Sequence, residues 1–238
     1  MASGPTLTNT SPRTPGFVLT RTSLSLKGNE MGLSSLRVVV LLGNLLIVPG
    51  MADAAQVFAN FGPDGSCAVT FKGEIRVGDE NIFNALTPDC NGGGVLLKSD
   101  GGSLTAGLRI GELIRQKGLE TAVAFDARCA SACALAWLGG TKRYMSNSSQ
   151  IGFHAAYTRD DKGTPLESGL GNALVGAYLT ELGLPKSTVI FVASAKPNQM
   201  NWLDSADAAR IGIKVVVLSK QDYEWVDALD RSDPHGSD

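Results

Sequence analysis

The chain has 238 residues, of which 43% are hydrophobic and 18% are charged, and its formal net charge is -2. This length suffices for one well-buried core, and the nearly balanced charge provides no basic field that would hold nucleic acid or an anionic membrane. We therefore predict a single folded domain at residues 55–230 and no nucleic-acid partner.

The first 54 residues are predicted to lie outside the folded domain. Residues 1–30 are rich in Ser, Thr, Pro and Gly and show no apolar periodicity. Such a segment cannot bury enough apolar surface to fold, so it is predicted to be a disordered leader. A second methionine, Met31, follows it and is a candidate for the true start.

A signal-peptide pattern follows Met31. Arg37 supplies the positive residue, residues 38–48 supply the apolar stretch, and Ala-Asp-Ala at 52–54 is a small-residue cleavage site. Cleavage after Ala54 would export the protein, and the periplasm is the predicted location. The alternative is a membrane anchor that is not cleaved, although the apolar stretch is well short of the roughly 18 residues that span a bilayer.

Strands and helices are predicted to alternate through the domain. The predicted strands span residues 68–76, 94–98, 121–125, 142–145, 150–157 and 214–218. The predicted helices span residues 78–86, 104–115, 131–138, 172–182, 187–195 and 206–211. This alternation favours parallel strands joined by helices, so the predicted fold class is α/β. The polar residues 231–238 are predicted to form a frayed tail.

Two residues of the domain have the chemistry of a nucleophile and a base. Ser131 stands where the strand 121–125 gives way to the helix 131–138, and His154 is the only histidine of the predicted domain because His235 lies in the tail. A serine hydroxyl is a weak nucleophile that needs an imidazole to take its proton. Taken singly, Ser131 would be a helix cap and His154 a core histidine.

Backbone N–H groups near Ser131 could stabilise an oxyanion. The positive end of the following helix would direct the Ala132 N–H toward a developing negative charge. Gly101 and Gly102 follow the strand 94–98 and offer further N–H groups without a side chain that would block a substrate. Two glycines in a row are also ordinary in a turn.

The cysteines form an even set of four, which permits disulfides in an exported protein. We favour Cys67 with Cys90 and Cys129 with Cys133, because the second pair lies four residues apart and would brace the turn at Ser131. Buried reduced thiols are the alternative if the protein is not exported. No Cys-x-x-Cys repeat occurs and no histidine neighbours these cysteines, so no zinc site is predicted.

Several segments resemble the Clp-type serine peptidases. Residues 99–107 read Ser-Asp-Gly-Gly-Ser-Leu-Thr-Ala-Gly and are similar to the Ser-Pro-Gly-Gly-Ser-x-Thr-Ala-Gly stretch of that family. Cys-Ala-Ser-Ala at 129–132 resembles the family's Ala-Ala-Ser-Met nucleophile turn, and residues 143–154 resemble its Arg, Asn-Ser and catalytic His run. The segment 202–213 is similar to the one that closes the family's domain, so the resemblance spans roughly residues 70–218.

The resemblance implies a ClpP/crotonase-like spiral of repeated β-β-α units. It implies Ser131 as nucleophile, His154 as general base and the N–H groups of Gly101, Gly102 and Ala132 as an oxyanion hole. The substrate would then be a peptide or protein, no cofactor would be needed, and a homo-oligomer remains open. The family works with a cytoplasmic ATPase, but an exported member would find no ATP, so no ATPase partner is expected.

The sequence departs from the family at three places. One is the pair Cys129 and Cys133, which flank Ser131 and which the family does not require. Asp100 replaces the proline before the glycine pair, and Met200 stands two residues before Trp202, where the family has the aspartate of its triad. Asn201 and Asp204 are the candidates for a third member, although Asp204 also has the spacing of a helix N-cap.

Three functions therefore remain open on sequence grounds. The first is an exported, ATP-independent serine peptidase or related hydrolase, and the second is an inactive member of the fold that serves as a binding or assembly module. The third is crotonase-type chemistry on thioesters, which export disfavours because it needs coenzyme A.

Overall fold

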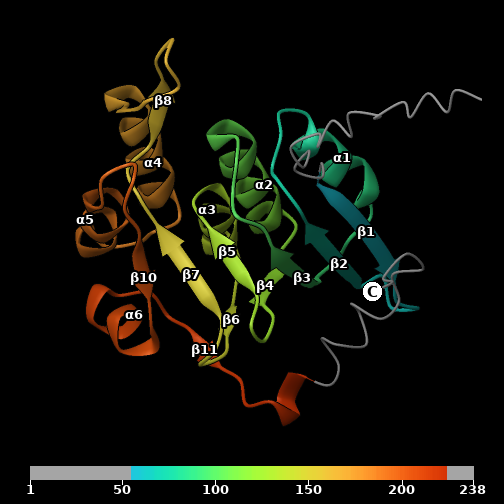
Figure 1. Ribbon diagram of the computed structural model, residues 1–238. Coiled ribbons are helices and arrows are strands. Elements are labelled where there is room, and N and C mark those ends of the chain that lie inside the picture. Colours follow the sequence, from blue (N-terminus) through green and yellow to red (C-terminus); the bar gives the residue numbers. More distant parts are fainter. Residues whose placement is uncertain (1–54, 224–238) are drawn as a thin grey trace, which may run out of the picture. The chain divides into compact units, whose positions relative to one another are not determined.

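The computed structural model describes residues 55–223. The predicted leader, the signal peptide with its site after Ala54 and the predicted tail 231–238 lie outside these residues. Within them the protein is an α/β domain in which six α-helices accompany the strands, so the predicted fold class is confirmed (Figure 1).

Six strands form the main sheet in the order β1-β2-β3-β4-β6-β11. Their bounds are β1 Gln56–Phe61, β2 Cys67–Lys72, β3 Gly93–Lys98, β4 Glu120–Val123, β6 Arg143–Met145 and β11 Val216–Val217. The neighbours from β2 to β11 pair in parallel, whereas β1 runs antiparallel to β2. Inward-facing residues alternate along these strands: Val69 and Phe71 of β2 lie beside Val95 and Leu97 of β3 in the core.

A second, three-stranded sheet carries the candidate site. It comprises β5 (Arg128–Ala130), β7 (Gln150–Phe153) and β10 (Asn201–Leu203), with β7 in the middle. β5 is parallel to β7, so both strands end at the same edge, and β10 is antiparallel to β7. A short hairpin of β8 (Tyr157–Arg159) and β9 (Pro165–Glu167) follows β7.

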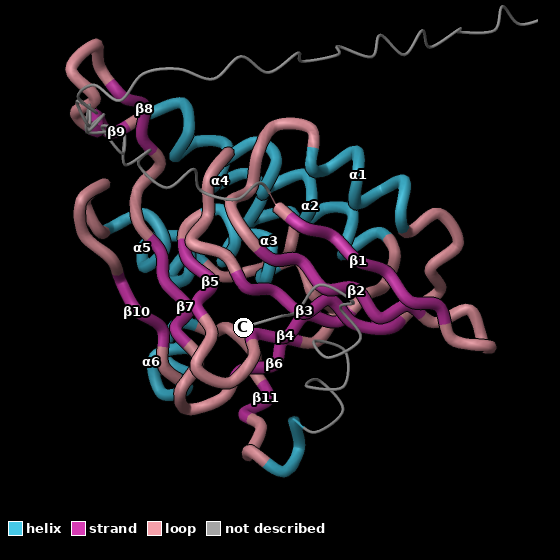
Figure 2. Tube along the Cα trace, turned by 45° about the vertical axis from the view of Figure 1, so that its right-hand side comes forward, coloured by secondary structure: helices cyan, strands magenta, loops and turns pink. Residues whose placement is uncertain are grey.

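The helices α1, α2 and α3 lie on one face of the main sheet (Figure 2). The six helices are α1 Asp79–Leu86, α2 Leu104–Gln116, α3 Ala132–Leu138, α4 Gly169–Glu181, α5 Lys186–Ser194 and α6 Ser205–Ile211, and a 3-10 turn spans Gln221–Tyr223. α2 approaches α3 closely because its glycines leave room: a Cβ on Gly107 would stand 2.7 Å from the Ala132 oxygen. This packing fixes the start of α3, which is where Ser131 lies.

The predicted strand 150–157 is divided in the structure. β7 ends at Phe153. Beyond it the backbone leaves the ladder, because the Ala155 N–H donates to the Ala195 oxygen at 2.8 Å and the Ala156 N–H donates to Asn172 Oδ1 at 2.8 Å. His154 therefore stands at the end of a strand, not inside one. The predicted strand 68–76 similarly ends at Lys72, where Gly73 adopts a positive φ of 100°.

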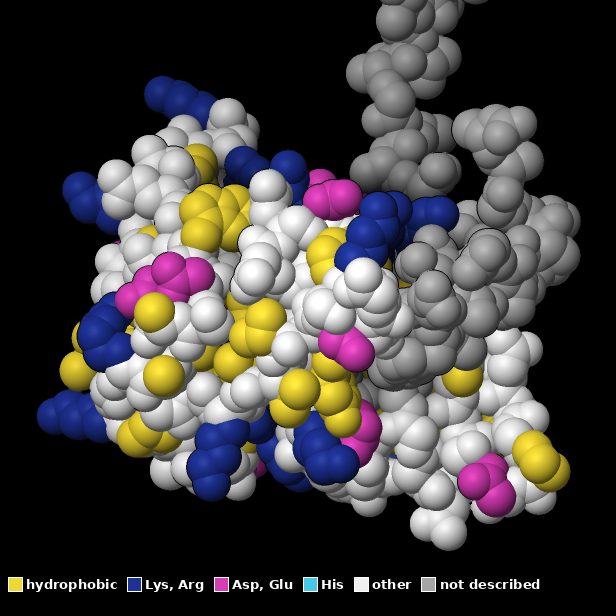
Figure 3. Space-filling view, turned by 90° about the horizontal axis from the view of Figure 1, so that it is seen from below, with side chains coloured by type: hydrophobic (Ala, Val, Ile, Leu, Met, Phe, Trp, Pro, Cys, Tyr) yellow, Lys and Arg dark blue, Asp and Glu magenta, His cyan; other side chains and the backbone are white. Residues whose placement is uncertain are grey.

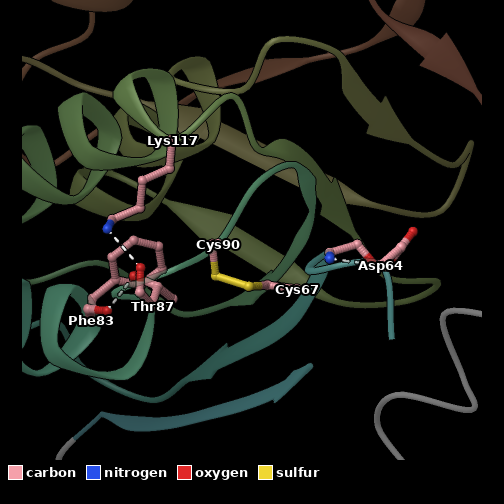
Figure 4. The surroundings of a disulfide bond; sticks show 7 residues. Asp64, Cys67, Phe83, Thr87, Cys90 and Lys117 are labelled. Atoms are coloured by element: carbon pink, nitrogen blue, oxygen red, sulfur yellow. Dashed lines mark hydrogen bonds between the residues drawn. A yellow bond between two sulfur atoms is a disulfide. The ribbon is translucent and has the colours of Figure 1, made fainter. Parts of the chain in front are cut away.

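Both favoured disulfide pairings are present in the structure. Cys67 joins Cys90 with 5.5 Å between Cα atoms, and Cys129 joins Cys133 with 5.1 Å between Cα atoms. The first bond ties β2 to the loop after α1, near the Thr87 carbonyl that accepts from Lys117 (Figure 4). Chain-entropy estimates give about 3 kcal/mol for the 23-residue separation and about 2 kcal/mol for the four-residue separation.

The face shown in Figure 3 mixes Lys and Arg with Asp and Glu, with apolar side chains between them. This distribution agrees with the nearly balanced charge of the sequence. No helix within residues 55–223 has the length and apolar character to cross a membrane.

Candidate active site

Ser131 and His154 leave the same edge of the three-stranded sheet. Ser131 follows the last residue of β5, His154 follows the last residue of β7, and the register pairs Ala130 with Gly152. Since paired strands lie about 4.8 Å apart, this register brings the two residues to neighbouring positions. Both side chains are half-buried and line one cavity of about 140 Å³.

The backbone of Ser131 is strained. Its φ of 54° and ψ of -121° lie in a region that residues other than glycine rarely adopt. The Ser131 N–H donates to the Gly152 oxygen at 2.8 Å, and the Ser131 oxygen accepts from the Leu135 N–H at 3.1 Å. This sharp strand-to-helix turn has the character of a nucleophile elbow, in which strain of about 1–3 kcal/mol exposes the serine oxygen.

The far end of α3 is held by two buried side chains. Arg143 donates from Nε and Nη2 to the Leu138 oxygen, at 2.9 and 2.7 Å, and Tyr178 donates its hydroxyl to the Leu135 oxygen at 2.9 Å. Burial, aided by the like charge of Arg115, lowers the pKa of Arg143 to about 10, so the guanidinium is charged at neutral pH. A cation at a helix C-terminus is favourable. Both contacts therefore stabilise the helix that begins at the candidate nucleophile.

The turn after β3 lies directly against Ser131. A Cβ on Gly101 would stand 2.7 Å from the Ala130 oxygen and 2.8 Å from the Ser131 Cβ. Gly101 has a φ of 102°, a conformation that favours glycine. The close approach to Ser131 and the positive φ together explain why glycine occupies position 101.

The two glycines differ in what their N–H groups do. The Gly101 N–H donates to Ser99 Oγ at 3.0 Å, so it is engaged within its own turn. Ile75 bonds to the residues on either side of Gly102, accepting from the Ser103 N–H at 2.7 Å and donating to the Gly101 oxygen at 2.8 Å. In a parallel pairing of this kind the Gly102 N–H points away from Ile75.

The N–H groups of Gly102 and Ala132 find no acceptor among residues 55–223. Ala132 opens α3, where an N–H has no partner within the helix. Gly102 lines the same cavity as Ser131. Of the three predicted donors, Gly102 and Ala132 thus have N–H groups without an acceptor in this part of the chain, whereas the Gly101 N–H is engaged in its own turn.

Asp100 points toward Arg128. Its Oδ1 lies 3.1 Å from Arg128 Nη1, and both side chains are exposed. Solvent and the guanidinium screen this carboxylate, which reduces its repulsion of a negative charge near the glycine turn.

The imidazole of His154 is oriented by backbone and by an aromatic ring. Its Nδ1 lies 2.8 Å from the Ala155 oxygen, and the ring centroid of Tyr157 is 5.5 Å away. With a carbonyl as its partner Nδ1 carries the proton, which leaves the Nε2 lone pair to act as a base. Within residues 55–223 no hydrogen bond joins His154 to the Ser131 hydroxyl, and such bonds often tighten only when substrate binds.

Neither predicted third member contacts His154. Asn201 donates from Nδ2 to the Phe191 oxygen and to Ser194 Oγ, both at 2.9 Å, so its amide faces α5. Asp204 accepts from the Asp207 N–H at 2.7 Å and is the N-cap of α6. Met200, at the position of the family's aspartate, packs over Gly152. No sequence signal identifies the Ala155 carbonyl as the partner of His154, because every residue carries one.

We expect Asn201→Ala and Asp204→Ala to leave kcat and KM for hydrolysis unchanged. Asp204→Ala should lower the free energy of unfolding by about 1 kcal/mol, since the first turn of α6 loses its cap. Steady-state kinetics and thermal unfolding of both variants check this. A loss of kcat in either variant with unchanged stability would show that the residue reaches His154 during catalysis.

The fold has counterparts among solved structures. Two structures of the 1510-N membrane-bound stomatin-specific protease match with TM-scores of 0.51 and 0.50 at 18% and 20% identity, and the second is a complex with a substrate peptide. They cover 67% and 65% of this chain, and 81% and 75% of their own. ClpP1 from Listeria monocytogenes matches with a TM-score of 0.49 at 17% identity, over 65% of this chain and 92% of its own.

No known protein family and no curated protein matches the chain by sequence. The structural matches nevertheless define the class: the domain has the ClpP-like fold that the sequence resemblance implies. At these identities the likeness extends to the fold alone.

Proposed function

We propose that the protein is an exported serine hydrolase, and specifically a peptidase that needs no ATP, with Ser131 as nucleophile and His154 as general base. The observation that carries the proposal is the joint geometry of the two residues. They leave paired strand ends and line one cavity, and the serine occupies a strained strand-to-helix turn. Likeness of fold to a protein named as a protease adds to it.

The proposed reaction proceeds by acyl transfer. Ser131 Oγ attacks the substrate carbonyl carbon while His154 Nε2 takes the hydroxyl proton. The N–H groups of Gly102 and Ala132 bind the oxyanion of the tetrahedral intermediate. Its collapse expels the amine, which receives the proton from His154. Water then attacks the acyl-enzyme in the same way, with His154 again as base, and releases the acid.

The cavity favours an apolar side chain next to the cleaved bond. Apart from Ser131, His154 and Gly102, its lining is apolar or aromatic: Leu104, Leu135, Phe153, Ala156, Tyr157, Val175 and Val192. A volume of about 140 Å³ accepts a side chain of medium size. Gly102 and Tyr157 also line a neighbouring groove that holds charged residues, including Lys72, Glu74 and Arg128. The rest of a peptide would extend into that polar groove.

A fluorophosphonate should label wild-type protein at Ser131 and should fail to label Ser131→Ala. Mass spectrometry of the labelled peptide identifies the site. If neither fluorophosphonate nor any peptide or ester reacts while the folded protein retains a binding partner, the protein is an inactive binding or assembly module.

Export is the second part of the proposal. The signal-peptide pattern and the two disulfides support it, since disulfides persist in oxidising compartments. N-terminal sequencing of protein recovered from the periplasm should begin at Ala55. A cytoplasmic product that retains the leader would contradict export, and a membrane-bound product with the leader attached would indicate an uncleaved anchor.

A further inference from the structure

One disulfide brackets the candidate nucleophile. Cys129 lies in β5, Cys133 lies in the first turn of α3, and Ser131 is midway between them. The backbone of Cys129 pairs with Ile151 of β7 and forms a bridge with Ser99. The bond therefore ties a residue fixed in the sheet to the start of the helix, across the turn that holds Ser131.

That turn needs such a constraint. A residue in a sparsely populated conformation keeps it only when its surroundings over-determine it. Ser131 has that conformation, and its N–H and oxygen each make one backbone hydrogen bond. The disulfide adds a covalent limit on how far the strand end and the helix start can separate.

We infer that Cys129 and Cys133 are positioning residues for Ser131, and that their disulfide holds the nucleophile turn in its reactive geometry. This inference rests on the proposed function. General stabilisation is a weaker explanation, because loop-closure entropy grows with loop length and this bond spans only four residues. The Cys67–Cys90 bond spans 23 residues, joins β2 to the loop after α1 and does not bracket Ser131, so it provides a control.

Burial indicates that this bond is a fixed constraint and not a redox switch. Both cysteines are fully buried, at 0% exposure, so a dithiol cannot reach the sulfurs in the folded protein. The bond must form during folding, by exchange with a disulfide oxidant. Two thiols give one protein disulfide, and the oxidant takes up two electrons and two protons to become two thiols.

The test compares Cys129→Ala/Cys133→Ala with Cys67→Ala/Cys90→Ala at a temperature below the unfolding transition of both. The first variant should lose about 10- to 100-fold in the rate of fluorophosphonate labelling, since small misplacements cost that much. Its kcat for an ester with an apolar acyl group should fall while KM stays the same. The control variant should label at the wild-type rate although its melting temperature falls further. Equal losses in the two variants, or wild-type labelling in the first, would overturn the inference.

Two further measurements keep the test decisive. Cys129→Val/Cys133→Ala restores part of the lost volume if the alanine variant does not fold, and it should show the same loss of labelling. Hydrogen exchange at the Ser131 and Leu135 amides needs no activity, so it still tests positioning if the wild type is not a hydrolase. Exchange there should accelerate at least tenfold in the Cys129/Cys133 variant and not in the control; unchanged exchange in both variants would refute positioning.

Discussion

Ser131→Ala and His154→Ala should each reduce hydrolysis by roughly 10³- to 10⁶-fold, and the double variant should be little worse than either. The two residues act as one unit, because a serine without its base and a base without its serine are equally ineffective. Their places at the ends of the paired strands β5 and β7 give this expectation its structural basis. Steady-state kinetics with a peptide and an ester of apolar acyl group provide the measurement.

Ser187→Ala is a suitable control, since Ser187 is exposed and donates to the Ile211 oxygen at 2.8 Å, away from the cavity. It should retain wild-type kinetics. Losses that simply multiply in the double variant would show that Ser131 and His154 contribute independently, which is incompatible with a nucleophile and base pair.

The helices of the domain could be predicted well from the sequence because their signals are local. The predicted helix 78–86 corresponds to α1 (Asp79–Leu86), and the predicted helix 131–138 to α3 (Ala132–Leu138). Apolar spacing and flanking glycines mark both. The ClpP-like fold followed from motif resemblance across most of the domain, and the structural matches confirm it.

The division into two sheets could not be predicted, because it depends on distant partners. β5 has only three residues and no distinct apolar pattern, and β1, β9 and β10 were not predicted either. The alternation of residues 150–157 continues past His154, yet the ladder ends there. Hydrogen bonds from Ala155 to Ala195 and from Ala156 to Asn172 replace it, and both partners lie far along the chain.

The candidate site could be predicted in residue type but not in every role. The structure brings together Ser131, His154 and Gly102 around one cavity. The Gly101 N–H, predicted as an oxyanion donor, donates to the Ser99 hydroxyl in this structure. Sequence spacing cannot show which of two adjacent glycines has its N–H engaged, since a side-chain rotamer decides it.

Gly101→Ala should reduce the labelling and hydrolysis rates by about 100-fold, because small displacements of reacting groups have effects of this size. The new Cβ would stand 2.7 Å from the Ala130 oxygen, 2.8 Å from the Ser131 Cβ and 3.2 Å from the Ala132 nitrogen. These are backbone atoms and a Cβ, which cannot rotate out of the way as the end of a long side chain can. The glycine turn or the nucleophile turn must therefore move. This movement displaces Ser131 and the Ala132 N–H relative to the Gly102 N–H.

The control for this variant is Gly78→Ala. Gly78 has a φ of 104°, almost that of Gly101, but a Cβ there would meet nothing within 4 Å. Both variants carry the backbone penalty of an alanine at positive φ, roughly 1–2 kcal/mol, so both should melt at a lower temperature. Only Gly101→Ala should also lose reactivity when the two are compared at a temperature where each is folded. If Gly101→Ala reacted with fluorophosphonate as fast as Gly78→Ala, the close approach of the two turns would not be what places Ser131 for catalysis.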